Sequence, residues 1–161
     1  MKTLIVYATT YGFTKDCVEE LKKLLKGEAL AINIGKDQIP PLKEFDQIVV
    51  GGSIYMGQLH KKLKEFCVAQ QQQLHGKRLA LFLCCGLPDN FEQALNSTFP
   101  KELLEQAITT ECFGGELRIN QMNFAHKMMT KLMKKAQEKE GKADPVKLTS
   151  NIQRLADIMN Q

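Results

Sequence analysis

Five short runs of apolar and β-branched residues divide the chain, and each predicts a strand that is buried on both faces. The runs cover residues 2–8, 29–34, 45–52, 79–85 and 108–115. Segments with apolar residues at helical spacing lie between them, so strands and helices alternate. This alternation predicts an α/β fold whose parallel sheet is covered by helices on both faces. Because no repeat, low-complexity tract or linker interrupts the pattern, we expect one domain over residues 1–161.

One helical segment is surplus to this plan. A helix over residues 146–159 is enough to close the sheet, yet residues 123–139 show another helical pattern inside an inserted stretch at 116–144. Its apolar stripe consists of Phe124, Met128, Met129, Leu132, Met133 and Ala136, and lysines occupy much of the remaining surface. This basic amphipathic segment has two interpretations. It is a lid packed on the domain with a solvated lysine face, or it docks transiently on an anionic membrane.

The composition is that of an ordinary globular chain of 161 residues, 43% of them hydrophobic and 25% charged. These values exclude a disordered or collagen-like protein. No apolar run reaches the roughly 18–20 residues that a membrane-spanning helix needs. The net charge of +4 is too small to indicate nucleic-acid binding, and no group of residues has metal-ligand spacing. Five cysteines without C-x-x-C spacing favour a reducing compartment, so we expect a cytoplasmic protein.

The candidate chemistry lies in the loop that joins the first strand to the first helix. Ligands of open α/β sheets bind beyond the carboxyl ends of the strands, where unpaired amides of a helix N-terminus attract anions. The loop consists of Thr9, Thr10, Tyr11, Gly12, Phe13 and Thr14, and contains neither Lys nor Arg. It therefore lacks the lysine of a loop that binds a nucleoside triphosphate, and it is not the G-x-G-x-x-G motif that binds a dinucleotide. A cradle of hydroxyls and amides suits a single phosphate monoester, as in FMN; the alternative is an ordinary Thr/Gly turn.

Several stretches together resemble a known family. Residues 9–14 resemble the phosphate loop of flavodoxins, T/S-x-x-G-x-T. Residues 1–6, 45–60 and 114–118, followed by the Met/Lys helix, resemble one branch more closely: the flavodoxin-like, menaquinone-dependent protoporphyrinogen IX dehydrogenases. The resemblance implies a doubly wound five-stranded sheet of order 2-1-3-4-5, with the extra helical segment between strand five and the last helix. It also implies FMN as cofactor, a porphyrinogen-type substrate, and a quinone or another redox partner.

The family pattern also implies which residues hold the cofactor. The FMN phosphate falls on residues 9–14, and the isoalloxazine ring falls between two further loops. These loops consist of Ser53, Ile54, Tyr55, Met56 and Gly57 after the third strand, and Cys85, Gly86, Leu87, Pro88 and Asp89 after the fourth. The second loop has no aromatic residue before Phe91. Tyr55 and Met56 are therefore the expected stacking partners of the ring.

Four further residues are candidates for catalysis, for substrate binding or for contact with a membrane. His60 stands at the start of a predicted helix beside the flavin loop, where it can transfer a proton or orient the substrate. The cations Arg118, Lys127 and Lys131 can pair with porphyrinogen propionates or lipid headgroups. A reactive thiol at Cys85 is a further alternative.

Two other functions compete with this enzyme. The first is a flavodoxin-type electron-transfer protein without a substrate of its own; such proteins are typically strongly acidic, whereas this chain carries +4. The second is a signalling receiver domain, which needs acidic residues after the first and third strands; those strands end in Tyr7-Ala8-Thr9 and Gly51-Gly52-Ser53, so this function is excluded. We expect a cytoplasmic enzyme, with peripheral contact at the inner face of the cell membrane under the docking interpretation.

Overall fold

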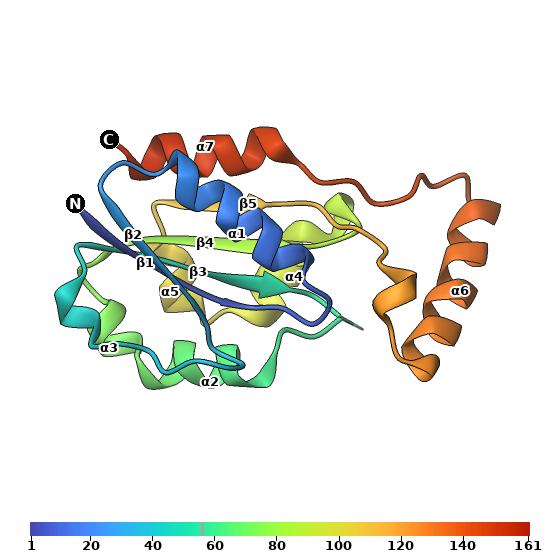
Figure 1. Ribbon diagram of the computed structural model, residues 1–161, viewed down its shortest axis with the longest axis horizontal. Helices are drawn as coiled ribbons and strands as arrows, with labels where there is room; N and C mark the ends of the chain where they lie inside the picture. Colours follow the sequence, from blue (N-terminus) through green and yellow to red (C-terminus); the bar gives the residue numbers. More distant parts are fainter. Residues whose placement is uncertain (56) are drawn as a thin grey trace.

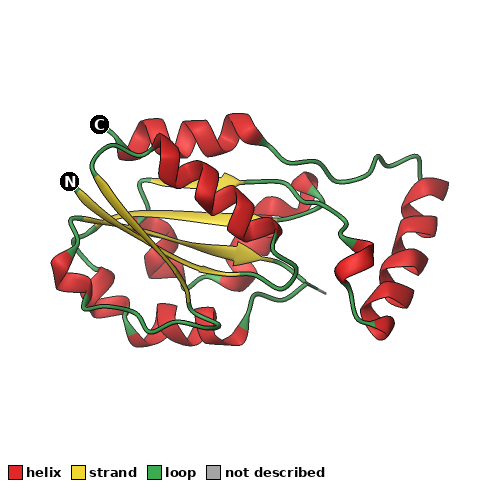
Figure 2. Ribbon diagram, viewed as in Figure 1, coloured by secondary structure: helices red, strands yellow, loops and turns green. Residues whose placement is uncertain are grey.

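The computed structural model describes residues 1–55 and 57–161 and contains one five-stranded, all-parallel sheet. The strands are β1 (Lys2–Ala8), β2 (Glu28–Asn33), β3 (Gln47–Ser53), β4 (Arg78–Cys84) and β5 (Thr109–Cys112). Their order across the sheet is β2-β1-β3-β4-β5, which confirms the predicted order. In Figure 2 the strands run side by side through the middle of the molecule, with helices on both sides.

The central strands are apolar throughout because both faces of the sheet are covered. Along β1, Leu4 and Val6 point into one helical layer, whereas Ile5 and Tyr7 point into the other. The same alternation runs through β3 and β4, where nearly every side chain is fully buried. The hydrophobic runs in the sequence therefore correspond to strands that are buried on both faces of the sheet.

Two helices cover one face of the sheet. They are α1 (Phe13–Leu24) and α7 (Thr149–Met159), which lie side by side in Figure 1. Beneath them Phe82 of β4 stacks on Phe113, with ring centroids 4.4 Å apart, and both side chains are fully buried. This layer fixes the start of α1 against the carboxyl end of β1.

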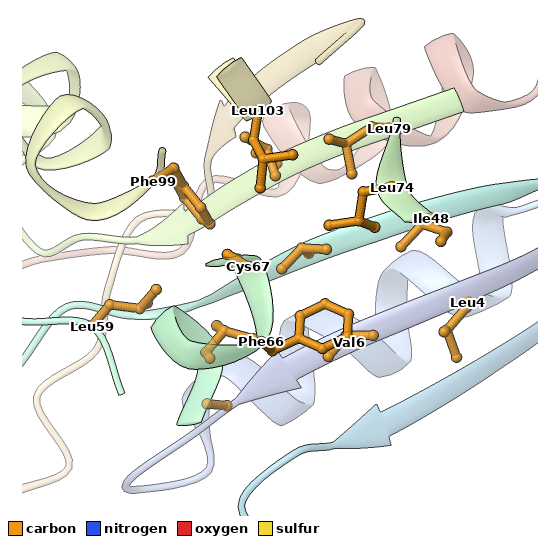
Figure 3. Packing of buried hydrophobic residues seen from close by; sticks show 14 of the residues in the cluster. Leu4, Val6, Ile48, Leu59, Phe66, Cys67, Leu74, Leu79, Phe99 and Leu103 are labelled. Carbon is orange, nitrogen blue, oxygen red and sulfur yellow. The ribbon is translucent and has the colours of Figure 1, made fainter. Parts of the chain in front are cut away.

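Four short helices cover the opposite face: α2 (Lys61–Ala69), α3 (Gln71–Leu74), α4 (Phe91–Thr98) and α5 (Lys101–Gln106). Figure 3 shows the apolar cluster between these helices and the sheet, where Phe66 and Cys67 of α2 face β1 and β3. The sequence after strand four predicts a helix that breaks near Pro100, and the structure confirms this: α4 ends before Pro100 and α5 begins after it, because proline has no backbone N–H to donate. Single turns of 3-10 helix complete the chain: η1 (Leu42–Glu44), η2 (Pro88–Asn90) and η3 (Ile119–Gln121).

The last helix begins later than the sequence predicts. It starts at Thr149 rather than at residue 146, and the fifth strand ends at Cys112 rather than at residue 115. Residues 146–148 are instead paired with residues 113–115: Gly115 N donates to Val146 O (3.1 Å), and Leu148 N donates to Phe113 O (3.0 Å). These hydrogen bonds tie the returning chain to the edge of the sheet, and the helix forms only after them.

The predicted extra helix exists as α6 (Phe124–Lys139) and lies apart from both helical layers. In Figure 1 it stands beyond the carboxyl ends of the strands, at the opposite end of the molecule from both termini. Asn123 begins it, because its side chain accepts a hydrogen bond from His126 N (2.9 Å). Within the described residues, no helix is both long enough and apolar enough to span a bilayer.

Candidate functional site

The turn between β1 and α1, residues 9–14, has the geometry of an anion cradle; we call it the phosphate turn. Gly12 has φ +84°, a conformation that side chains with a Cβ rarely adopt. Its N–H donates to Thr9 Oγ1 at 3.0 Å, which fixes the turn and leaves the Thr9 O–H available as a donor. Thr14 Oγ1 is buried and has no hydrogen-bond partner among the described residues. A buried hydroxyl without a partner is unfavourable, so this site fits an anionic ligand that accepts its proton.

A cavity of about 640 Å³ opens directly from the phosphate turn. Its volume lies within the range of cofactor and small-molecule sites. The walls come from the loops after β1, β3, β4 and β5, and from α4 and α6. Thr9, Thr10, Tyr11, Phe13 and Thr14 line it at one end. The structure thus brings four loops that are far apart in the sequence to one site, as the topology of a parallel sheet requires.

The loop after β3 supplies one wall of the cavity. Ser53, Ile54, Tyr55 and Gly57 line it, while the predicted stacking residue Met56 lies outside the described residues. Gly57 has φ +73°, and a Cβ there would meet nothing within 4 Å among the described residues. Tyr55 Oη is buried without a hydrogen-bond partner in the described part of the chain. This loop therefore places an aromatic residue in the wall of the cavity, with its hydroxyl buried behind the surface.

The loop after β4 supplies the facing wall. Cys85, Gly86 and Leu87 line the cavity, whereas the predicted residues Pro88 and Asp89 belong to η2 and are absent from the described lining. The sequence prediction missed three polar lining residues: Asn90, which ends η2, and Gln93 and Ser97 of α4. Gln93 and Ser97 are four residues apart and so lie on one side of α4, and this periodicity was the available signal.

His126 also contacts the site, although no pattern in the sequence indicated this position. Its Nδ1 is hydrogen-bonded to the hydroxyl of Tyr11, and its ring lies 4.5 Å from that of Tyr55. Tyr11 and Tyr55 are themselves in edge-to-face contact at 5.8 Å. Burial and the neighbouring Tyr55 raise the pKa of Tyr11 above its ordinary value. The first turn of α6 is therefore anchored on aromatic residues of the loops after β1 and β3.

Arg118 lies against the phosphate turn. Its Nη1 is 3.4 Å from Tyr11 O, its Nη2 is 2.5 Å from Asp16 Oδ2, and its Nε is 2.8 Å from Glu116 Oε2. The guanidinium carbon also lies 5.9 Å from the centre of the Phe13 ring. Hydrogen bonds to Asp16, and to Glu116 beside it, raise the pKa of Arg118 further above its ordinary value. The structure thus places this cation beside the phosphate turn.

The face that α6 turns toward the cavity differs from its apolar stripe. The lining residues are Thr130, Met133, Lys134 and Gln137. Lys134 also pairs with Asp144 at 2.9 Å, and this carboxylate raises the pKa of Lys134. Lys127 and Lys131 are absent from the described lining. Among the described residues, Lys134 is therefore the lysine of α6 that lines the cavity. The sequence had named Lys127 and Lys131 for contact with a substrate or a membrane, and that role stays a prediction.

The remaining candidates lie elsewhere or are shielded. His60 precedes α2, is exposed, and is absent from the described lining of the cavity. All five cysteines are free and buried. Burial raises the pKa of the Cys67 thiol to about 12 and that of Cys84 well above its ordinary value. No group of residues within the described part of the chain can hold a metal ion.

Comparison with known proteins gives the family. The flavodoxin domain model matches residues 4–144. The chain belongs to the flavodoxin domain family. Among curated proteins it is similar to the protoporphyrinogen IX dehydrogenase [quinone] of Escherichia coli K12, with 28% identity over 84% of this chain and 80% of the relative. The predicted resemblance is thereby confirmed at the level of the family.

Solved structures confirm the fold. A flavodoxin from Streptococcus pneumoniae TIGR4 superposes with a TM-score of 0.61 at 13% identity, covering 99% of this chain and 97% of that one. An archaeal flavodoxin gives 0.57 at 16% identity over the full length of both chains. A Fusobacterium nucleatum flavodoxin bound to flavin mononucleotide gives 0.50 at 15% identity, over 68% and 69% of the two chains. At these identities the likeness supports the architecture of this flavodoxin-like chain.

Proposed function

We propose that this flavodoxin-like protein is an FMN-dependent oxidoreductase that takes electrons from a porphyrinogen-type substrate and passes them to a quinone. The observation that carries the proposal is one continuous cavity. It begins at a hydroxyl-lined phosphate turn, passes between two loops, one of which carries the half-buried Tyr55, and ends at a wall made by α6. The curated relative in Escherichia coli supports the substrate by its name, and the flavodoxin with bound flavin mononucleotide supports the cofactor.

The phosphate turn is the part of the cavity that fits the FMN phosphate. Thr9 and Thr14 direct hydroxyls to it, and the first turn of α1 adds unpaired amides and the positive end of the helix dipole. Gly12 allows close approach of the backbone. We assign phosphate binding to these groups.

The two loops beyond the turn would hold the isoalloxazine ring. Tyr55 offers an aromatic face on one side, and residues 85–87 close the other side. When bound, FMN supplies the redox chemistry, because its ring accepts electrons from one partner and releases them to another. The role of this chain is to orient the ring, to exclude water with α6, and to admit the substrate.

The space beneath α6 would hold the substrate. Met133 provides an adaptable apolar surface, and Lys134 and Gln137 provide a cation and an amide that can bind carboxylates. A porphyrinogen carries both a large apolar ring and propionates, so the two kinds of residue match its two parts. His60 retains no assigned role in this arrangement because it lies outside the described lining.

Substrate-dependent reduction of a quinone by the purified holoprotein tests this function. We expect porphyrin fluorescence to appear when a porphyrinogen and a soluble quinone are both present. We expect Lys134→Gln to raise KM for the porphyrinogen about fivefold with little change in kcat, since it removes one carboxylate contact. Lys131→Gln, on the outer face of the same helix, is the matched control and should leave both constants unchanged. Electron exchange only with reductase proteins would instead support an electron-transfer protein.

We propose further that α6 contacts an anionic membrane, where a quinone resides. The outer face of the helix exposes Phe124 by 81%, Met128 by 49% and Leu132 by 69%. Lys131 and Lys135 are exposed along the same face. Exposed apolar side chains flanked by lysines are typical of helices that lie in the headgroup region of a bilayer.

Vesicle sedimentation tests the membrane contact. The double substitution Lys131→Gln with Lys135→Gln should weaken binding to phosphatidylglycerol vesicles by about tenfold or more, at about 1 kcal/mol per lysine. Lys101→Gln, on the exposed surface of α5, is the control and should bind as the wild type does. Equal binding of all three proteins, or equal binding to zwitterionic vesicles, would contradict the contact.

A further inference from the structure

The phosphate turn contains no cation of its own, yet the fold brings one to it from the segment after β5. Arg118 Nη1 lies 3.4 Å from the carbonyl oxygen of Tyr11. It also lies 3.1 Å from the position that a Cβ on Gly12 would take. The Arg118 side chain is only 19% exposed, so the guanidinium is held at the turn.

Two carboxylates surround this guanidinium. Arg118 Nη2 lies 2.5 Å from Asp16 Oδ2 and 2.7 Å from Glu116 Oε2. Asp16 stands in the first turn of α1, and Glu116 lines the cavity. Both negative charges therefore lie near the helix N-terminus that the phosphate would occupy. Without a cation, they would repel a dianion at that position.

We propose that Arg118 is a positioning residue for the cofactor phosphate, which acts by neutralising Asp16 and Glu116 beside the phosphate turn. This inference rests on the proposed binding of FMN. It explains why an acidic residue is tolerated in the first turn of α1, next to an anion site. It also gives the inserted segment a direct part in cofactor affinity, since Arg118 comes from that segment and the turn comes from the start of the chain.

Fluorescence titration of FMN into the apo form of the full chain tests the inference. We expect Arg118→Met to raise the Kd for FMN about tenfold at about 50 mM salt, and by less at about 300 mM salt because the charges are screened. Arg118→Lys keeps the charge and should stay within about threefold of the wild type. Lys101→Met removes an exposed ion pair with Glu105 on α5, away from the cavity, and should have no effect.

The decisive variant is the double substitution of Arg118→Met with Asp16→Asn. If charge is the cause, it should recover most of the affinity that Arg118→Met loses. Asp16 is exposed, so Asp16→Asn should leave folding intact. This single substitution should lower the Kd for FMN about threefold, because one of the two carboxylates that neutralise the charge of Arg118 is removed.

An Arg118→Met protein with wild-type affinity would overturn the inference. So would an Asp16→Asn protein that binds FMN no more tightly than the wild type. A third result would also overturn the inference: the double variant binds FMN as weakly as Arg118→Met does, and Arg118→Lys binds it weakly too. Arg118 would then only support the backbone of the turn. Absence of FMN binding by the wild type would instead refute the proposed function.

Discussion

The sheet with its two helical layers and the inserted segment at 116–144 use apolar residues in opposite ways. In the sheet, side chains such as Val49 and Leu81 are fully buried, and most apolar positions of the central strands are covered by a neighbouring helix. On α6, Phe124 and Leu132 are exposed by 81% and 69%, while a largely polar face that includes Met133 lines the cavity. The first region buries its apolar residues and folds around them; the second leaves them exposed, where we propose that they contact a membrane. The site lies where they meet.

The largest expected difference between the regions is in stability. Phe82 is fully buried and stacks on Phe113, so Phe82→Ala should lower the free energy of unfolding by about 3–5 kcal/mol. Leu132→Ala on α6 should change it by less than about 0.5 kcal/mol. Urea denaturation of both variants measures the contrast. A Leu132→Ala loss as large as that of Phe82→Ala would mean that α6 belongs to the core.

The second expected effect concerns the cofactor end of the cavity. Gly12→Val forces a β-branched residue into a backbone with φ +84° and places its Cβ against Arg118, so FMN affinity should fall about 100-fold. Gly141→Val has a similar φ of +70° but meets nothing within 4 Å among the described residues. It is the matched control, and titration with FMN should find its affinity unchanged. Equal affinities in the two variants would argue against the phosphate turn.

A third, smaller effect tests a polar position within the sheet. Burial raises the pKa of Glu111 above its ordinary value of 4.5, although Arg154 at 3.4 Å acts in the opposite direction. Between 4.5 and the higher pKa of the folded state, the native protein binds more protons than the unfolded chain, so stability falls as pH rises through this interval. Glu111→Gln should abolish that fall and raise stability at pH 7 by about 1 kcal/mol.

Thermal unfolding from pH 4 to pH 7 measures this effect. Glu105→Gln, at an exposed position of α5, is the control and should keep the pH dependence of the wild type. A Glu111→Gln protein with unchanged pH dependence would show that Glu111 is as well solvated in the folded state as in the unfolded chain.

The smallest effect on global stability is expected at the anchor of α6. His126→Ala removes contacts with Tyr11 and Tyr55, so trypsin should cleave the lysines of α6 about tenfold faster, while the unfolding free energy changes by less than about 0.5 kcal/mol. His75→Ala, on the exposed end of α3, should change neither. Unchanged cleavage in His126→Ala would show that other contacts hold the helix.

Local sequence pattern predicts the sheet because every strand has neighbours on both faces. The same reasoning predicts that α6 exists but misjudges its faces, because an apolar stripe is buried only if another element covers it. The predicted start of α7 at residue 146 was wrong for a related reason: residues 146–148 are hydrogen-bonded to residues 113–115 at the edge of the sheet. Contacts between segments that are distant in the sequence determine both the buried face of α6 and the start of α7.

The site was predicted where it lies within one loop and was missed where distant segments meet. The phosphate turn is a continuous hexapeptide, so its hydroxyls and glycine could be identified together. Arg118 was predicted as a cation for the substrate or a membrane, and His126 was not predicted. Both reach Tyr11 from positions more than a hundred residues away, and no local spacing indicates such a contact. Lys134 lines the cavity, but the sequence could not distinguish it from the other lysines of α6, because these lysines differ only in the side of the helix on which they lie.

The most direct test of the account is the identity of the flavin in the purified protein. Heating should release a yellow compound that is FMN, at about one molecule per chain, since the phosphate turn provides for one phosphate monoester and lacks a dinucleotide motif. Apo protein should take FMN up again. Release of FAD, or a colourless protein that binds no flavin, would contradict the central claim that this turn holds the phosphate of FMN.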